Sequence, residues 1–422
     1  MEFRLILASY DKVWVKSDDA VEVQFSNGTD AWSISKEKVE KYTSENRPQF
    51  QNTMLGYSRV NVPEKSILQV VVNKAILSGS SNSTPEAQEK LVLKFLRTFV
   101  FHEGFHYFIQ NSEKGWVEGA KDTVRFPRAT TYPLQSNPRI YRNHIFKLLI
   151  KAYSSEEMRA RYLRDAAFWF NKYKTEFPAE LEQIRSTDRI EGTARYAENA
   201  SLVAINHGFD AKSKDMAAFL ATTYGDLPYL DTLSQEAYEL GYVAGLHLDM
   251  INKCWKNEIH HHEISPLEIL FRDIMPSDVE PRMEGDYAAK ITETIEAENA
   301  DLQASMALFK RVVNGENVGN LLFLPSSAGS FRAGAFYKHS ELDRSFTYLK
   351  DFVQTFENGK DVVKINKASV FDMPGKNDCA YKGNFYVLME SGSPQNIELG
   401  METRETKNES GQTVLCLTAF EK

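Results

Sequence analysis

Two histidines four residues apart are the residues of this chain best suited to chemistry. They enclose a glutamate in the pentapeptide His102-Glu103-Gly104-Phe105-His106. Positions i and i+4 of a helix lie on one face, so both imidazoles can reach one metal ion while Glu103 lies beside the ion's open position. The pattern predicts a zinc site, with His102 and His106 as ligands and Glu103 as the general base.

The residues before this pentapeptide predict the helix that it needs. Ser83 is a suitable cap, Pro85 suits the first helical position, and Glu86 follows Ser83 by three residues as in a capping box. Apolar residues then recur at helical spacing up to the histidines. We therefore expect one helix from Pro85 to about Gln110.

A catalytic zinc ion has three protein ligands and keeps its fourth position for water. Glu191 is one candidate for the third ligand. It lies 85 residues after His106 in a segment that reads as a helix, where the small residues after it allow close packing against the histidine helix. Glu118 follows His106 by only 12 residues, which forces the chain to turn back at once. The spacing favours Glu191 and leaves Glu118 as the alternative, while a surface ion pair of Glu191 with Arg195 also stays open.

The two motifs together resemble those of a known family. HEGFH followed by EGTARY is similar to the gluzincin branch of the zincin metallopeptidases, in which a glutamate of an E-G-x-A-x-Y type segment is the third zinc ligand. The resemblance implies that Glu191 has this role, and it implies a zincin-like fold with one Zn²⁺ ion. The stretch between the motifs, about 122–185, is longer here than is usual in the family. The resemblance covers about half of the chain.

Hydrolysis of peptide bonds is the activity that the resemblance implies, with a peptide or protein as the substrate. Zinc lowers the pKa of its bound water, so that Glu103 can accept a proton and later pass it to the leaving amine. Two alternatives remain open. One is a zinc hydrolase that acts on a non-peptide substrate, and the other is a catalytically silent zincin-fold protein that binds or regulates a partner.

Several further residues are candidates for supporting roles. Glu198 lies seven residues after Glu191 on the same helical face, where it can orient a ligand histidine. A donor to the developing oxyanion usually helps such a reaction, and the candidates are Tyr196, taken first, and Tyr132, His207 and His247. Arg128 and Tyr132 lie in a proline-flanked, extended stretch and are candidates for binding substrate, although a packed loop explains this stretch equally well. Consecutive side chains diverge, so we expect the histidines at 260–262 to form a solvated turn.

Composition and charge narrow the class of protein. The chain has 422 residues, of which 42% are hydrophobic and 12% aromatic, enough for a sizeable core in two or three domains. Its net charge of -8 argues against nucleic acid or an anionic membrane as the main partner. No run of residues approaches the roughly 18 apolar residues of a membrane span.

The cysteines and the first nine residues are the features of the sequence that indicate the cellular compartment of the protein. Cys254, Cys379 and Cys416 are odd in number and widely spaced, so we expect neither a disulfide scaffold nor a cysteine zinc site. The apolar part of the first nine residues is too short for a signal peptide. The sequence favours a cytoplasmic protein, with a secreted or periplasmic one as the alternative if a signal peptide has been removed.

The fold class that these patterns predict is α+β, in three parts. Residues 1–82 form a β-rich part of the catalytic unit, with strands that include 2–8, 13–15, 21–25 and 68–72. Residues 83–275 form a large helical region that carries the histidine helix. A boundary with two prolines follows, and residues 282–422 form an α+β accessory domain. In this domain we expect helices at 287–313 and 341–356 and several strands.

Overall fold

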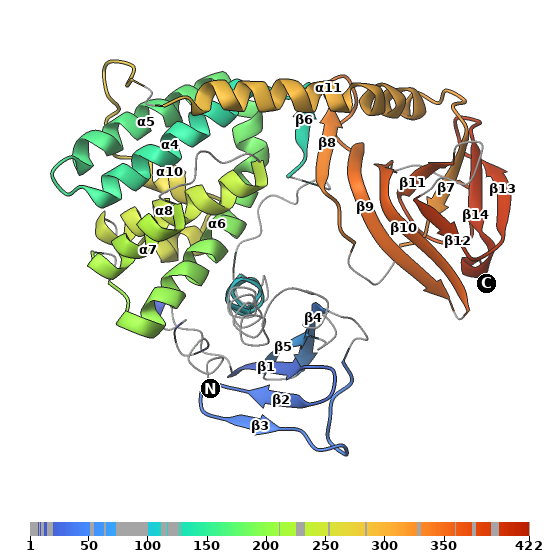
Figure 1. Ribbon diagram of the computed structural model, residues 1–422, viewed down its shortest axis with the longest axis horizontal. Helices are drawn as coiled ribbons and strands as arrows, with labels where there is room; N and C mark the ends of the chain where they lie inside the picture. Colours follow the sequence, from blue (N-terminus) through green and yellow to red (C-terminus); the bar gives the residue numbers. More distant parts are fainter. Residues whose placement is uncertain are drawn as a thin grey trace, which may run out of the picture. The chain divides into compact units, whose positions relative to one another are not determined.

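The computed structural model describes residues 7, 9, 12–14, 20–50, 55–62, 65–72, 100–110, 116, 126, 128–210, 212–224, 233–251, 254–282, 285–326, 331–358, 360–373, 377–389 and 396–421. The chain divides into two compact units (Figure 1). The first unit comprises Met1–Ala120 and Tyr141–Glu284, and the second comprises Lys121–Ile140 and Gly285–Lys422. Within the described part, the fold is α+β, with an N-terminal sheet, a central helical region and a C-terminal mixed sheet, which confirms the predicted class.

The N-terminal sheet of the first unit has the strand order β3-β2-β1-β5-β4. Its strands are β1 (Ala20–Ser26), β2 (Ala31–Ile34), β3 (Val39–Lys41), β4 (Leu55–Val62) and β5 (Lys65–Val72). β1 pairs in parallel with β5, and β4 pairs antiparallel with β5 and forms an edge. The strands expected at 21–25 and 68–72 are therefore confirmed. The strand expected at 13–15 is wrong, because Val13 is helical.

The helices of the first unit follow one another from α4 to α10. They are α4 (Ser136–Ser154), α5 (Arg159–Glu176), α6 (Pro178–His207), α7 (Lys214–Tyr224), α8 (Leu233–Ile251), α9 (Trp255–His261) and α10 (Pro266–Phe271). The first turn of α4, up to Ile140, is assigned to the second unit. Pro178 stands at the start of α6, where its missing N–H costs nothing, and Gly208 ends the helix with a φ of 75°. Among the described residues, no helix has the length and apolar character that crossing a bilayer requires.

Two glycines bring α6 and α8 into direct backbone contact. A Cβ atom built on Gly192 would lie 2.7 Å from the Cα atom of Gly241, and one built on Gly241 would lie 2.4 Å from the Cα atom of Gly192. No side chain fits in this gap, so only glycine permits the approach. We expected the small residues after Glu191 to face the histidine helix, but Gly192 instead faces α8.

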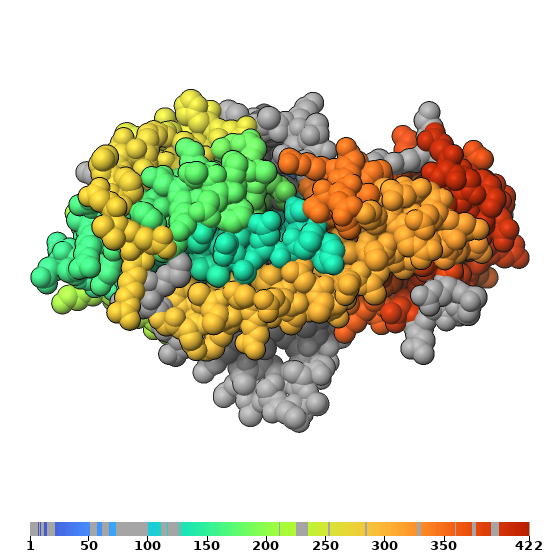
Figure 2. All heavy atoms as spheres, turned by 90° about the horizontal axis from the view of Figure 1, so that it is seen from above, coloured from blue at the N-terminus to red at the C-terminus, as the bar shows by residue number. Residues whose placement is uncertain are grey.

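The second unit is built on a mixed sheet with the order β13-β14-β7-β11-β10-β9-β8-β6, and β12 pairs with β10. The strands are β6 (Thr130–Tyr132), β7 (Asn320–Leu324), β8 (Ala335–His339), β9 (Thr347–Asn358), β10 (Asp361–Asp372), β11 (Phe385–Met389), β12 (Ile397–Leu399), β13 (Thr403–Lys407) and β14 (Thr413–Leu417). Helix α11 (Tyr287–Val313) has the predicted bounds. Its residues Met306 and Phe309 pack in one apolar cluster with Tyr348 and Phe371 of the sheet. The outer side of α11 is exposed (Figure 2).

The helix expected at 341–356 is wrong, because most of this segment lies in β9. Its residues Phe352, Gln354 and Phe356 are buried and alternate with more exposed neighbours, which is the period of a strand that has one face in a core. β9 is paired on both sides, with β8 and β10. The sheet thus determines the conformation of a segment whose local pattern we took for a helix.

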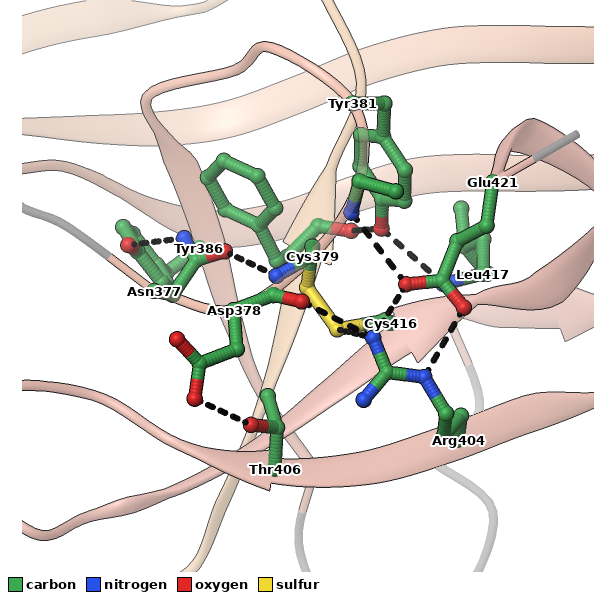
Figure 3. The surroundings of a disulfide bond; sticks show 12 residues. Asn377, Asp378, Cys379, Tyr381, Tyr386, Arg404, Thr406, Cys416, Leu417 and Glu421 are labelled. Carbon is green, nitrogen blue, oxygen red and sulfur yellow. Dashed lines mark hydrogen bonds and ion pairs between the residues drawn. A yellow bond between two sulfur atoms is a disulfide. The ribbon is translucent and has the colours of Figure 1, made fainter.

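A disulfide links Cys379 to Cys416, contrary to our expectation from the odd number of cysteines. It joins the segment before β11 to β14, and Arg404 lies against it (Figure 3). The Arg404 guanidinium donates to both carboxylate oxygens of Glu421 and to the carbonyl oxygen of Asp378, 2.9 Å away. A cross-link between cysteines 37 residues apart is worth about 4 kcal/mol of unfolded-chain entropy in the loop-closure model.

Candidate metal centre

The histidine helix is described over residues 100–110 and is helical from 100 to 108. Its predicted start at Pro85 lies outside the described residues. Apolar side chains anchor it in the first unit: the Phe105 ring lies 4.8 Å from the Trp14 ring, centroid to centroid. The Tyr107 hydroxyl donates to the carbonyl oxygen of Val60 on β4, at 3.0 Å. The helix is therefore attached directly to the edge strand of the N-terminal sheet.

Glu191 of α6 meets both histidines of this helix. Its Oε2 atom lies 3.0 Å from Nε2 of His102 and 3.3 Å from Nε2 of His106, and the two Nε2 atoms are 3.1 Å apart. His102 and Glu191 are buried, and His106 is partly buried. Of the described acidic, histidine and cysteine residues, these three are one of two groups whose geometry could hold a metal ion. The other group contains both disulfide cysteines, whose sulfur atoms are already bonded to each other.

The hydrogen-bond partner of a histidine's Nδ1 atom shows which ring nitrogen carries the hydrogen and which carries the lone pair. Nδ1 of His106 lies 2.6 Å from Oε1 of Gln110, whose amide nitrogen donates to the carbonyl oxygen of Ile190. The Gln110 oxygen can only accept, so Nδ1 of His106 carries the hydrogen. Nδ1 of His102 lies 3.2 Å from a carboxylate oxygen of Glu198 but makes no hydrogen bond with it. The tautomer is therefore fixed for His106, whose Nε2 atom presents a lone pair to Glu191.

The three atoms fit a zinc ion. The Nε2 lone pair of His106 and the Glu191 carboxylate oxygen, 3.3 Å apart, repel each other unless a cation lies between them. Protonation is unfavourable at neutral pH for His106, because burial first, and His102 second, lower its pKa to about 4. Ligands at about 2.0–2.1 Å from a tetrahedral zinc ion are about 3.3–3.4 Å apart, close to the observed spacings. Two imidazoles and one carboxylate also suit zinc chemically.

Glu103, the predicted base, follows His102 directly on the helix and is half-buried. Its side chain is thus neither sealed in the core nor fully in solvent. On a helix it lies 100° around from His102 and about 60° from His106, so it flanks the face that carries the two histidines on the His106 side.

Tyr196, the first candidate for an oxyanion donor, is fully buried on α6. Its hydroxyl donates to Asp249, and its ring lies 5.2 Å from that of Trp255. In this arrangement the hydroxyl is already used and is not available to a substrate. The structure thus places Glu198 against His102, a candidate ligand, but it places the Tyr196 hydroxyl in a separate polar contact.

Further residues around the candidate ligands escaped the sequence analysis. The ring of Tyr238 on α8 stacks on His102, with centroids 5.3 Å apart. Arg195 donates to both carboxylate oxygens of Glu198, at 2.8 and 2.9 Å, and lies 3.5 Å from Glu239 of α8. Arg195 therefore pairs with Glu198, and the alternative prediction of a surface ion pair between Glu191 and Arg195 is wrong. The pair of Arg195 and Glu198 could have been predicted, because the two residues are three apart on one helix. No sequence pattern indicates that Tyr238 or Glu239 lies here.

The remaining predicted residues are not part of this group. Glu118 lies outside the described residues. Arg128 and Tyr132 belong to the second unit, so their contribution to the same site stays a prediction.

His207 faces Asp215, 3.8 Å away, and His247 is buried. His261 and His262 are exposed, as predicted, but the predicted turn is wrong for His260 and His261, which end helix α9.

His247 makes the stability of the first unit sensitive to acid. Burial lowers its pKa to about 4, and its Nε2 atom donates to the carbonyl oxygen of Leu149 at 2.9 Å. The unfolded chain takes up this proton near pH 6.5, so the free energy of unfolding falls as the pH drops from about 6.5 to 4. His247→Gln keeps a donor and removes the titration. Chemical unfolding in EDTA should show that the variant loses about 2.5 kcal/mol less than wild type between pH 7 and 4.5; equal losses would contradict this assignment.

Comparison of the chain with family models, with curated proteins and with solved structures finds no match.

Proposed function

We propose that the protein is a zinc-dependent metallopeptidase with a gluzincin-type site in its first unit. The observation that carries this proposal is the triangle of His102, His106 and Glu191, in which both Nε2 atoms lie 3.0–3.3 Å from one carboxylate oxygen. The pentapeptide supplies two ligands and a base, and α6 supplies the third ligand from 85 residues further along the chain.

Each residue has a distinct task in this proposal. His102, His106 and Glu191 hold the ion, Gln110 keeps His106 in the tautomer that binds it, and Glu198 lies beside the ring of His102, 3.2 Å from its Nδ1 atom. The zinc ion, when bound, supplies an acidified water and polarises the substrate carbonyl group. Glu103 takes up the proton of the attacking water and delivers it to the leaving amine.

The arrangement of the first unit supports the zincin-like part of the proposal. A mixed sheet, with β1 and β5 parallel and β4 antiparallel at its edge, is attached to the histidine helix through Tyr107 and Val60. The helix with the third ligand lies on the other side of the pentapeptide, where Gln110 binds Ile190 and Thr193 of α6. Both ligand-bearing helices are thus fixed by contacts outside the site.

Metal content tests the proposal most directly. Protein purified without a histidine tag should contain about one zinc ion per chain by mass spectrometry, as expected for one such site. His102→Ala and Glu191→Gln should lose it, since each removes a ligand. Glu182→Gln, at an exposed position of the same helix as Glu191, should retain it. A folded wild type that contains no zinc after zinc has been supplied would refute the proposal.

We also propose that the protein works in an oxidising compartment, as a secreted or periplasmic protein. The disulfide between Cys379 and Cys416 supports this, because such bonds rarely persist in a reducing cytoplasm. Protein from its own cells, alkylated at the moment of lysis, should be labelled at Cys254 alone, since that cysteine is exposed and is not part of the disulfide. Labelling of all three cysteines would place the protein in a reducing compartment.

A further inference from the structure

Gln110 contacts both segments that supply the candidate ligands. It lies four residues after His106, one helical turn away, and its Oε1 atom accepts a hydrogen bond from Nδ1 of His106 at 2.6 Å. Its amide nitrogen donates to the carbonyl oxygen of Ile190 at 2.8 Å and to Oγ1 of Thr193 at 2.7 Å. The acceptor and both donor hydrogens of this one side chain are therefore engaged.

The contacts with α6 determine how the Gln110 amide is turned. The carbonyl oxygen of Ile190 can only accept, so the amide nitrogen must face α6 and the oxygen must face His106. The Thr193 hydroxyl donates to the carbonyl oxygen of Arg189 at 2.6 Å, which leaves its oxygen free to accept from Gln110. If the Gln110 amide were rotated by 180°, its oxygen would face the oxygens of Ile190 and Thr193, and its NH₂ group would face Nδ1 of His106. The hydrogen of the imidazole would then lie on Nε2, where it blocks a metal ion.

We propose that Gln110 is a positioning residue that holds His106 in its metal-binding tautomer and sets the distance between His106 and Glu191. Ile190 and Thr193 flank Glu191 on α6, so the same side chain that orients His106 also fixes the helix that carries the third ligand. The hydrogen bonds run in one direction, from His106 through Gln110 to Thr193 and Arg189, which increases the basicity of Nε2. This inference rests on the proposed metal site.

Two variants separate this role from a merely structural one. Gln110→Glu keeps an oxygen that accepts from Nδ1 of His106 but loses the donors to α6, whereas Gln110→Met loses both functions. In protein freed of metal by EDTA, the ring nitrogens of His106 can be observed by long-range ¹H–¹⁵N NMR. We expect hydrogen on Nδ1 in wild type and in Gln110→Glu, and a mixture of tautomers in Gln110→Met. Gln303→Met, at an exposed position of α11, is the matched control.

Zinc binding gives the second readout, by competition with a chromophoric chelator. Gln110→Met should raise the zinc dissociation constant about 10- to 100-fold, as is typical for loss of a residue that supports a ligand, and Gln303→Met should leave it unchanged. Equal tautomers and equal zinc affinity in wild type and Gln110→Met would overturn the inference, as would hydrogen on Nε2 of His106 in wild type. If Gln110→Met does not fold, a mixture of tautomers in Gln110→Glu would overturn it instead.

The two proposals fail in distinguishable ways. A wild type that binds no zinc but holds hydrogen on Nδ1, and loses this preference in Gln110→Met, refutes the metallopeptidase and supports the action of Gln110 on His106. A wild type that binds zinc, with the same affinity and the same His106 tautomers as Gln110→Met, refutes only the role of Gln110.

Discussion

Replacing Glu103 with glutamine should abolish hydrolysis and leave the metal in place. Glutamine has nearly the same shape as glutamate but cannot accept a proton, and positioned proton transfer contributes about 10²- to 10⁴-fold to such reactions. Glu103 is not one of the three residues that converge at 3.0–3.3 Å, so zinc should remain at wild-type stoichiometry. The measurement is the turnover of a peptide library, with zinc content determined on the same samples.

The control variant Glu182→Gln separates the effect of losing Glu103 from the general effect of replacing a glutamate with glutamine. This residue is also a glutamate on a helix of the first unit, but its side chain is 70% exposed, and its loss should leave turnover unchanged. Full peptidase activity in Glu103→Gln would exclude Glu103 as the base. Zinc in the wild type without hydrolysis of any peptide would favour one of the two alternatives, a hydrolase of non-peptide substrates or a silent binding protein.

Removing the charge of Arg142 should destabilise the first unit by about 3–5 kcal/mol. The side chain is fully buried and donates to both carboxylate oxygens of Asp188, at 3.0 and 2.6 Å, and to Glu236 at 2.8 Å. Burial alone would lower the pKa of Arg142, but the two carboxylates outweigh it and hold the pKa above its ordinary value. Arg142→Met leaves these buried carboxylates without their counter-charge, which chemical unfolding should report.

Two further variants show whether the loss comes from the uncompensated charges. Arg142→Met combined with Asp188→Asn and Glu236→Gln removes the charges together and should recover much of the lost stability. Arg164→Met removes an arginine whose side chain is 50% exposed and lies 3.8 Å from Asp278, and it should cost less than about 1 kcal/mol. A similar loss for Arg142→Met and Arg164→Met would contradict the assignment.

Much of the candidate site follows from local spacing. His102 and His106 are four residues apart on a helix, so their convergence depends only on helix geometry. Gln110, four residues further, could have been found by the same rule, but its link to α6 could not, because that link depends on tertiary packing. Tyr238 reaches His102 only because α6 and α8 touch, and no local pattern contains that information.

The fold was predictable where periodicity was long and unambiguous. The 27 residues of α11 have apolar positions at helical spacing throughout, and its bounds were predicted as observed. β9 was mistaken for a helix, since its conformation is determined by hydrogen bonds to the adjacent strands β8 and β10 and not by the spacing of its own apolar residues. The pairing of Cys379 with Cys416 was likewise hidden, because an odd number of cysteines does not say which one remains free.

The backbone contact between Gly192 and Gly241 limits how this chain can evolve. Gly192 is the neighbour of Glu191, and any side chain at either glycine would force α6 away from α8 and carry Glu191 with it. Surface residues tolerate substitution, and even the ring of Tyr238 can be replaced by a ring of similar size. Distant relatives that keep the site must therefore keep both glycines, and a glycine after the glutamate on one helix, opposed by a glycine on the next, would identify them when overall similarity is lost.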